Sequence, residues 1–300
     1  MRVIPPLTMT DARLTSSTVA EPDTGEAVYV GATVYALDAV VISTTTHRKY
    51  KSLAAGNSGN ALTDTTKWQD IGPTNKWAMF DLLRNTATTK ASPLTVVITP
   101  GIRVDSLAVM GIAAQSAVIT MTSGGVMVYS KTVNLNTREV LGFKDFCFAP
   151  FTTQPSLVLF DLPPYTNGVI TITLTSTTGP VSCGAVAFGS YIYIGEIQHG
   201  AEDDGLNFSK IERLFDGTAT LLPRRAVPKT NQTVIVDKDR VKKVRDLRLL
   251  LNAVPAVWSG LDDAADGYFE SFLILGIYKR FSINAASDEQ ATINLELEEI

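Results

Sequence analysis

Short apolar runs, many of them alternating with polar residues, dominate the middle of the chain. Candidate strands lie at residues 94–99, 103–110, 117–122, 126–133, 156–160 and 169–175. Turn-forming pairs such as Pro100 with Gly101 and Asn167 with Gly168 separate them. Many short strands at this spacing predict a β-sandwich, jelly-roll-like, over residues 76–200. A last long strand is predicted over 181–197, broken by Gly184, Gly189 and Gly195.

The final hundred residues follow a different pattern. A helix is predicted over residues 239–252, because apolar residues recur at helical spacing and basic residues occupy the other face. The apolar set is Val241, Val244, Leu247, Leu251 and Val254, and the basic set is Lys242, Lys243, Arg245 and Arg248. Alternation of Ile293, Leu295 and Leu297 with polar residues predicts a closing strand. Residues 201–300 are therefore interpreted as an α+β domain.

The N-terminal quarter divides into two parts. Residues 1–27 are rich in Pro, Ser and Thr without a clear period, which predicts an extended N-terminal arm ordered by a partner. Residues 28–75 hold short strands and a Gly- and Asn-rich stretch at 56–60, expected to be a flexible loop. Fewer than fifty residues make a thin core, so this small β-module is expected to need a neighbour.

Chain length and composition indicate the number of domains and the fold class. A chain of 300 residues favours two or three domains, and abundant Thr with recurring β-branched runs favours strands. The expected fold is thus mainly β and multidomain: a small β-module, a β-sandwich and a C-terminal α+β domain. A net charge of −4 argues against general nucleic-acid binding.

No cofactor, metal or membrane insertion is expected. Cys147 and Cys183 form neither a disulfide framework nor a zinc-ligand set, and two buried thiols are the expectation. The longest apolar runs fall far short of the roughly 20 residues of a membrane span. The first residues lack the apolar centre of an export signal, so synthesis in the cytoplasm without export is expected.

Candidate catalytic residues are few. His47 and His199 are the two histidines, and no G-x-S-x-G motif accompanies either one. Carboxylates cluster at residues 202–204 and at Asp262, Asp263 and Asp266, but neither group has the spacing of an EF-hand loop. Solvated loop ends explain both clusters better than a metal site or a glycosidase pair, so no catalytic residue is assigned.

Aromatic side chains give the candidate binding site. Tyr29, Tyr35, Tyr50 and Trp68 could form a stacking face for sugar rings. The competing interpretation is that they form the core of a small module, and for Trp68 an anchoring role is favoured narrowly. Trp77 is expected to be a core anchor where the sandwich begins.

Three stretches carry a family resemblance. Residues 29–53 followed by Trp68 resemble a chitin-binding-type carbohydrate module, although Tyr29 stands where such modules often open with Trp. The string IGPTNKWAMFD at residues 71–81 resembles the junction into the β-sandwich of bacteriophage tail and baseplate proteins. The C-terminal strings FDGTATLLPRR, TVIVDKDRVKKV and FLILGIYKRFSI are similar to the C-terminal part of phage tail proteins.

The resemblance implies a non-enzymatic structural component of a bacteriophage tail tip or baseplate, located in the virion. Its implied partners are other tail proteins and copies of itself, with host-surface glycans as a further ligand. The alternative is a cell-wall or polysaccharide hydrolase with an attached carbohydrate-binding module. For the basic face of the helix at 239–252, a solvated polar face and a contact to an acidic neighbour are favoured equally over DNA.

Overall fold

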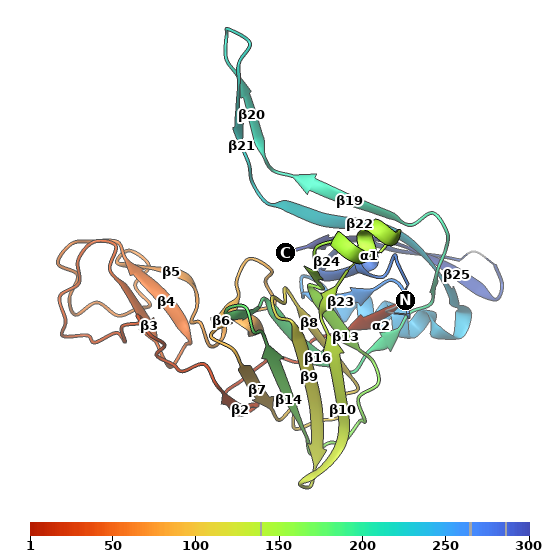
Figure 1. The fold of residues 1–300 in the computed structure, drawn as a ribbon, viewed down its shortest axis with the longest axis horizontal. Helices are drawn as coiled ribbons and strands as arrows, with labels where there is room; N and C mark the ends of the chain where they lie inside the picture. The colour runs from red at the N-terminus through yellow and green to blue at the C-terminus, as the bar shows by residue number, and fades with distance from the viewer. Residues whose placement is uncertain (139, 264–265, 286) are drawn as a thin grey trace. The chain divides into compact units, whose positions relative to one another are not determined.

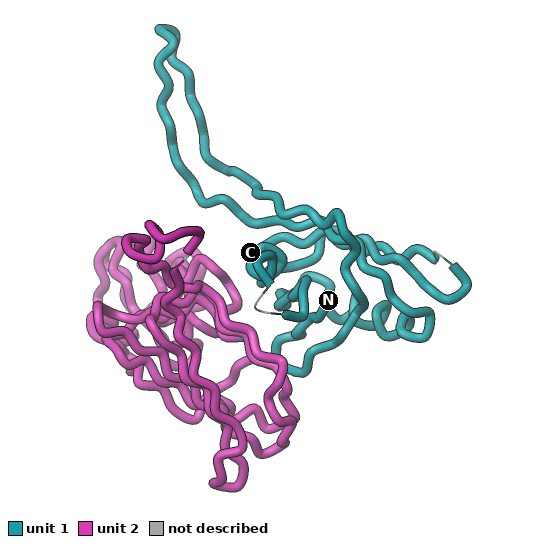
Figure 2. Tube along the Cα trace, turned by 45° about the vertical axis from the view of Figure 1, so that its right-hand side comes forward, with its two compact units in different colours: residues 1–7, 187–300 teal, residues 8–186 magenta. Residues whose placement is uncertain are grey.

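The computed structural model describes residues 1–138, 140–263, 266–285 and 287–300. Strands hold 46% of the residues and helices 8%, so the expected mainly β fold is confirmed. The chain divides into two compact units (Figure 2). One combines Met1–Leu7 with Ala187–Ile300, and the other is Thr8–Val186.

The unit Thr8–Val186 contains the β-sandwich. Its larger sheet has the order β10-β9-β14-β7-β2, with strands β2 (Leu14–Ser17), β7 (Leu94–Ile98), β9 (Ser116–Ser123), β10 (Val126–Asn134) and β14 (Gly168–Thr175). A second sheet has the order β13-β8-β16, with strands β8 (Ser106–Met110), β13 (Ser156–Leu159) and β16 (Ala185–Gly189), the last of which crosses into the other unit. Shorter pieces are η1 (Ala78–Phe80), β6 (Thr88–Lys90), β11 (Asn136–Thr137), α1 (Phe143–Phe148), β12 (Thr152–Thr153) and β15 (Val181–Cys183).

Alternation along β14 explains why this sheet has one buried face. Ile170, Ile172 and Leu174 are buried, and the threonines between them are partly exposed. Ile172 lies opposite Ile119 of β9, which is also fully buried. The period of two places Ile170, Ile172 and Leu174 together on the core side, as the sequence predicts.

The small module is a three-stranded antiparallel sheet formed by β3 (Val40–Ser43), β4 (Arg48–Ser52) and β5 (Trp68–Pro73). Val41 and Ile42 are buried, while Val40 is exposed. The stretch at 56–60 is held in place rather than free. Asn57 pairs with Tyr35 through two backbone hydrogen bonds of 2.9 and 3.0 Å, and its side chain donates to Ser52 Oγ at 3.1 Å.

The other unit is organised by one sheet, with the order β17-β1-β23-β24-β25-β22-β18 (Figure 1). Its strands are β1 (Arg2–Ile4), β17 (Ile192–Tyr193), β18 (Glu196–Ile197), β22 (Ala226–Asp237), β23 (Ala256–Ser259), β24 (Leu273–Ala285) and β25 (Gln290–Glu299), with η3 (Glu270–Phe272) before β24. The strand predicted over 181–197 with breaks at Gly184, Gly189 and Gly195 is present as four short strands, β15 to β18.

The N-terminal residues differ from the predicted arm. β1 pairs with β17 on one side and with β23 on the other, and Val3 and Ile4 are fully buried. β2 pairs with β7 of the sandwich. These segments are therefore ordered by their own chain. A three-residue strand next to Pro5 and Pro6 is too short to show a period, which is why its pattern is inconspicuous.

Gly195 lets the two ends of this sheet approach each other. β17 and β18 are outer strands of the sheet order, yet only Ile194 and Gly195 separate them along the chain. Gly195 has φ 135°, and a Cβ atom there would lie 2.1 Å from the carbonyl oxygen of Ile235. Only glycine fits this crossing.

The predicted helix is present as α2 (Val241–Leu250), preceded by η2 (Lys238–Arg240). Val244 and Leu247 are buried in a core shared with Val3, Trp258 and Ile274. The hydrophobic stripe of the helix therefore covers the sheet, as its spacing predicts.

A long hairpin, residues 202–237, extends from this unit (Figure 1). At its base β19 (Glu202–Asn207) pairs with β22, and at its tip, residues 208–225, β20 (Lys210–Arg213) pairs with β21 (Ala219–Leu222). All eight residues of β20 and β21 are exposed.

We expect deletion of residues 1–7 to unfold the unit that contains the C-terminus. Met1, Val3 and Ile4 are each buried, and about 1.5–3 kcal/mol per buried side chain gives a loss of about 5 kcal/mol or more. This loss matches the whole stability of many domains. Val3→Asp should act similarly in a thermal melt, and Thr8→Asp at an exposed position is the control. An unchanged melting temperature in the deletion variant would instead support a dispensable arm.

Candidate functional site

Three of the four predicted sugar-stacking residues meet inside the small module. The rings of Tyr29 and Tyr35 stack with centroids 5.9 Å apart, and both meet Trp68 edge-on at 5.6 and 5.3 Å. Trp68 is only 2% exposed. Its Nε1 donates to the carbonyl of Asn60 at 3.1 Å, and the Tyr29 hydroxyl donates to the same oxygen at 2.7 Å. The indole is therefore a core group of the module.

Tyr50 lies apart from this ring cluster. It occupies β4 opposite Val41 and Asp70, and it is partly buried. Its hydroxyl lies 3.2 Å from Thr46 Oγ1. The structure thus brings Tyr29, Tyr35 and Trp68 together, whereas Tyr50 belongs to the end of the module near the β3–β4 turn.

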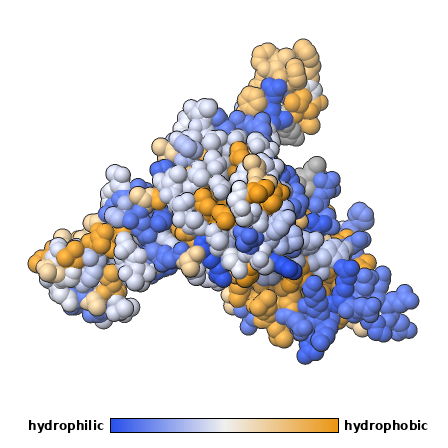
Figure 3. Space-filling model, turned by 90° about the horizontal axis from the view of Figure 1, so that it is seen from below, coloured by the Kyte–Doolittle hydropathy of each residue, from blue (hydrophilic) through white to orange (hydrophobic). Residues whose placement is uncertain are grey.

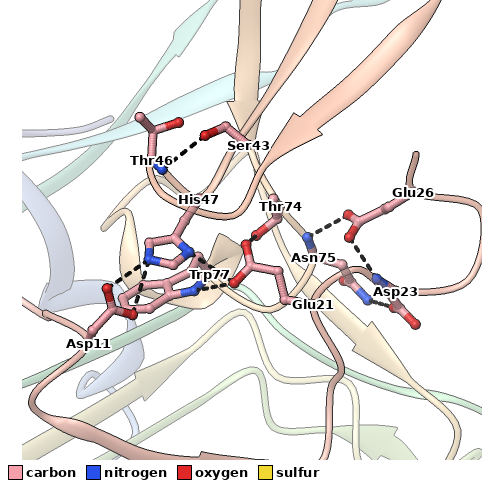
Figure 4. A network of polar contacts seen from close by, with 10 residues as sticks. All are labelled: Asp11, Glu21, Asp23, Glu26, Ser43, Thr46, His47, Thr74, Asn75 and Trp77. Carbon is pink, nitrogen blue, oxygen red and sulfur yellow. Dashed lines mark hydrogen bonds and ion pairs between the residues drawn. The ribbon is translucent and has the colours of Figure 1, made fainter. Parts of the chain in front are cut away.

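The module is joined to the start of the sandwich through the carboxylate of Glu21 (Figure 4). This carboxylate accepts hydrogen bonds from Thr74 Oγ1 at 2.7 Å and from Trp77 Nε1 at 3.0 Å. A third contact of 2.9 Å reaches His47 Nδ1. The Glu21 side chain is only 5% exposed, so the three donors compensate for burial of its charge.

His47 completes this junction. Its Nε2 lies 3.1 Å from the carboxylate of Asp11, and its ring stacks on Trp77 with a centroid distance of 4.1 Å. Both ring nitrogens face carboxylate oxygens, which accept hydrogen bonds. His47 adopts φ 56° in the turn between β3 and β4. Sequence reasoning placed it in a solvated strand end and missed this network, because its partners lie 26 and 36 residues away.

A second polar cluster reinforces the same junction. Glu26 accepts from the backbone N–H of Asn75 at 3.1 Å and lies 3.3 Å from Lys49 Nζ. Asn75 also donates to Asp23 at 2.5 Å. This bond, together with the N–H of Thr24, lowers the pKa of Asp23. The resulting stabilisation is present above the ordinary pKa of 3.8 and is lost as the pH falls through the lower value of the folded chain.

A shallow depression of about 380 Å³ lies beside this network. Its lining includes His47, Trp77, Phe80 and Asp81. Burial raises the pKa of Asp81, although hydrogen bonds from Thr86 and Leu83 act in the opposite direction. The depression combines aromatic rings with carboxylates and hydroxyls, but its side chains are largely engaged with one another.

A larger cavity of about 720 Å³ lies in the unit that contains the C-terminus. Tyr193, Glu196, His199 and Arg240 contribute to its lining. The guanidinium of Arg240 lies 5.0 Å from the centre of the Tyr193 ring. Burial, and then the nearby carboxylate of Glu196, raise the pKa of Tyr193. Asp237 lies 3.9 Å from the Nε of Arg240 at the same cavity, so the lining is polar and partly ion-paired.

The described members of the predicted carboxylate clusters are exposed or engaged in separate contacts. Glu202, Asp203 and Asp204 lie on β19 and are exposed. Asp262 pairs with Arg2 Nε at 3.1 Å, and Asp266 accepts from the N–H of Tyr268 at 2.9 Å. Among the described residues, no group of three or more His, Cys, Asp and Glu side chains is arranged to hold a metal ion.

The two cysteines differ in their exposure to solvent. Cys183 is buried, and burial raises the pKa of its thiol to about 12. Cys147 is exposed on α1, so the expectation of two buried thiols is wrong for it.

Within the described residues, no helix has the length and apolar character needed to cross a membrane. No protein-family model matches this chain, and no curated protein is similar to it.

We expect Trp68→Ala to unfold the small module. Truncation of a buried aromatic side chain costs roughly 3–5 kcal/mol, which is more than a three-stranded module of this size can supply. Val34→Ala, at a position 68% exposed, should change stability by no more than about 0.5 kcal/mol. Hydrogen exchange of residues 28–75 measures both effects. Unchanged exchange in Trp68→Ala, with loss of binding on a glycan array, would return Trp68 to the role of sugar platform.

Glu21→Ala should loosen the junction between module and sandwich. Three donors lose a buried acceptor, and an unsatisfied buried group costs roughly 1–3 kcal/mol. Asp11→Ala is the matched control, because the Asp11 side chain is 77% exposed and its contact to His47 should contribute no more than about 1 kcal/mol. Faster hydrogen exchange at residues 45–48 and 74–78 in the first variant alone is the expected result. Equal changes in both would show that His47, rather than Glu21, holds the junction.

Proposed function

We propose that this chain is a non-enzymatic structural subunit of a larger assembly, and specifically of a bacteriophage tail tip or baseplate. The phage setting is supported by the resemblance of residues 71–81 and of the C-terminal hundred residues to phage tail and baseplate proteins, with residues 29–53 resembling a carbohydrate-binding module. The role as a subunit is supported by the long hairpin, whose tip is apolar and has no covering side chains among the described residues.

The hairpin tip needs a partner. Ile211 and Leu221 lie opposite each other and are 64% and 67% exposed, and Phe215 at the turn is fully exposed. A two-stranded hairpin is at best marginally stable alone in water, and apolar side chains on it gain nothing from solvent. Burial against another chain would stabilise both the strand pair and these side chains.

A second apolar surface lies around α1. Leu141, Phe143, Phe146, Phe148 and Phe151 are all exposed, and no residue of α1 is buried. The guanidinium of Arg138 lies 5.4 and 5.2 Å from the rings of Phe146 and Phe151. Clustered exposed aromatic side chains of this kind mark interaction surfaces.

The small module adds a third exposed apolar surface, visible as orange side chains on the lobe at the left of Figure 3. It comprises Val28, Val30, Val34, Leu37, Val40, Leu53 and Ile71. Three separate apolar surfaces on one chain favour a subunit with several neighbours over a free monomer.

Glycan binding is the less supported part of the proposal. Trp68 is buried, so a glycan would have to contact the partly exposed rings of Tyr29, Tyr35 or Tyr50. The alternative function, a hydrolase with an attached module, has no supporting observation among the described residues. Both ring nitrogens of His47 face carboxylates rather than a serine hydroxyl.

Replacement of the hairpin tip, residues 208–225, by a two-residue turn tests the assembly role. The thermal melt should change little, because the tip strands contain no buried residue. The oligomers formed by the full chain, measured by light scattering and electron microscopy, should be lost. Phe215→Ser should weaken assembly in the same direction, and Asp216→Ser beside it should not. Assembly that is unaffected by removal of the tip would contradict the proposal.

A further inference from the structure

The helix α2 borders a groove with an apolar floor and a cationic rim. The groove has a volume of about 560 Å³. Val241, Ile283 and Ala291 contribute apolar side chains to it, and Lys238, Lys242 and Arg245 contribute positive charge. An extended segment that carries carboxylates and apolar side chains would match both properties.

The cations of the groove differ in ion pairing from Lys229 and Lys279 of the same unit. Lys229 pairs with Glu296 at 2.7 Å, and Lys279 pairs with Glu298 at 3.3 Å. In the described part of the chain, no ion pair joins Lys238, Lys242 or Arg245 to a carboxylate, even though Asp246 lies on the same helix. The positive charge of the groove is therefore not neutralised by an ion pair among the described residues.

The same unit carries an extended segment with exposed carboxylates and apolar side chains. Glu202, Asp203 and Asp204 begin β19, and Leu206 and Phe208 follow them. β19 pairs with β22 on one side, and no other strand pairing of β19 is described. An edge strand with an open side can lie against a second chain.

The spacing of the carboxylates along β19 matches the spacing of the cations along α2. Side chains alternate along a strand, so Glu202 and Asp204 point to one face roughly 7 Å apart, and Asp203 points to the other. Lys242 and Arg245 are three residues apart on a helix, which places them roughly 5–6 Å apart on one face. Two acidic side chains can therefore meet two cations in a single register.

We propose that the groove beside α2 binds the acidic edge strand β19 of a second copy of this chain. The groove and β19 belong to one unit, and no residue of β19 lines the groove of its own copy. Two copies can therefore make the contact reciprocally about a two-fold axis, or the contact can repeat head to tail from copy to copy and close into a ring. This inference rests on the proposed function, since it names the contact through which the subunits associate.

Paired charge reversal tests the contact. The groove variant is Lys242→Glu with Arg245→Glu, and the strand variant is Glu202→Lys with Asp204→Lys. Each alone should weaken self-association by about tenfold or more, because like charges then face each other. An equimolar mixture of the two variants should associate again, since each groove then meets a strand of opposite charge. Wild-type association should also weaken as salt is raised.

Controls and readouts separate the possible outcomes. Lys243→Glu lies on the same helix outside the groove lining, and Asp203→Lys lies on the other face of β19, so both should associate like the wild type. Sedimentation velocity measures association, and circular dichroism confirms folding. If the hairpin-tip variant fails to assemble while both reversal variants assemble normally, the groove contact is wrong and the proposed function stands. Failure of the mixed variants to associate would also overturn the contact, and a wild-type chain that stays monomeric would overturn both proposals.

Discussion

The pairing of β1 with β17 and β23 is the contact on which the architecture depends. It joins residues 2–4 to partners near residues 192 and 258, so one unit is assembled from both ends of the chain. The backbone N–H of Leu7 donates to the carbonyl of Phe188 at 2.8 Å, which holds the two ends of the intervening unit close together. Residues 8–186 thus form an inserted unit with adjacent ends, an arrangement that independent domains tolerate well.

This connectivity has a cost in entropy and in folding time. Closure of a loop of nearly two hundred residues must precede the contacts that stabilise β1, and non-local strand pairing is slow for the same reason. The inserted unit lowers the cost when it folds first, because its own β-sandwich then brings residues 7 and 188 together. Gly195 lies between the outer strands β17 and β18, and no side chain fits there beside Ile235.

Local periodicity made part of this fold predictable. α2 and strands such as β7, β9 and β14 were predictable because their apolar spacing is complete within ten residues. β1, the long hairpin and the Glu21–His47–Trp77 junction were not, because their partners lie far away in sequence. The cluster of Tyr29, Tyr35 and Trp68 shows a different limit of prediction from sequence. A sugar platform and the core of a small module require the same aromatic residues, and only the inward direction of Trp68 distinguishes them.

The exposed apolar residues of β20, β21 and α1 lie on elements that contribute little to either core. β20, β21 and α1 contain no buried residue, so their Ile, Leu and Phe side chains do not stabilise the chain that carries them. Exposed apolar surface on a free monomer instead promotes non-specific association. An explanation in terms of the isolated fold therefore fails for these segments. The proposed burial against neighbouring subunits would account for them, because it supplies the apolar contacts that these side chains lack in the monomer.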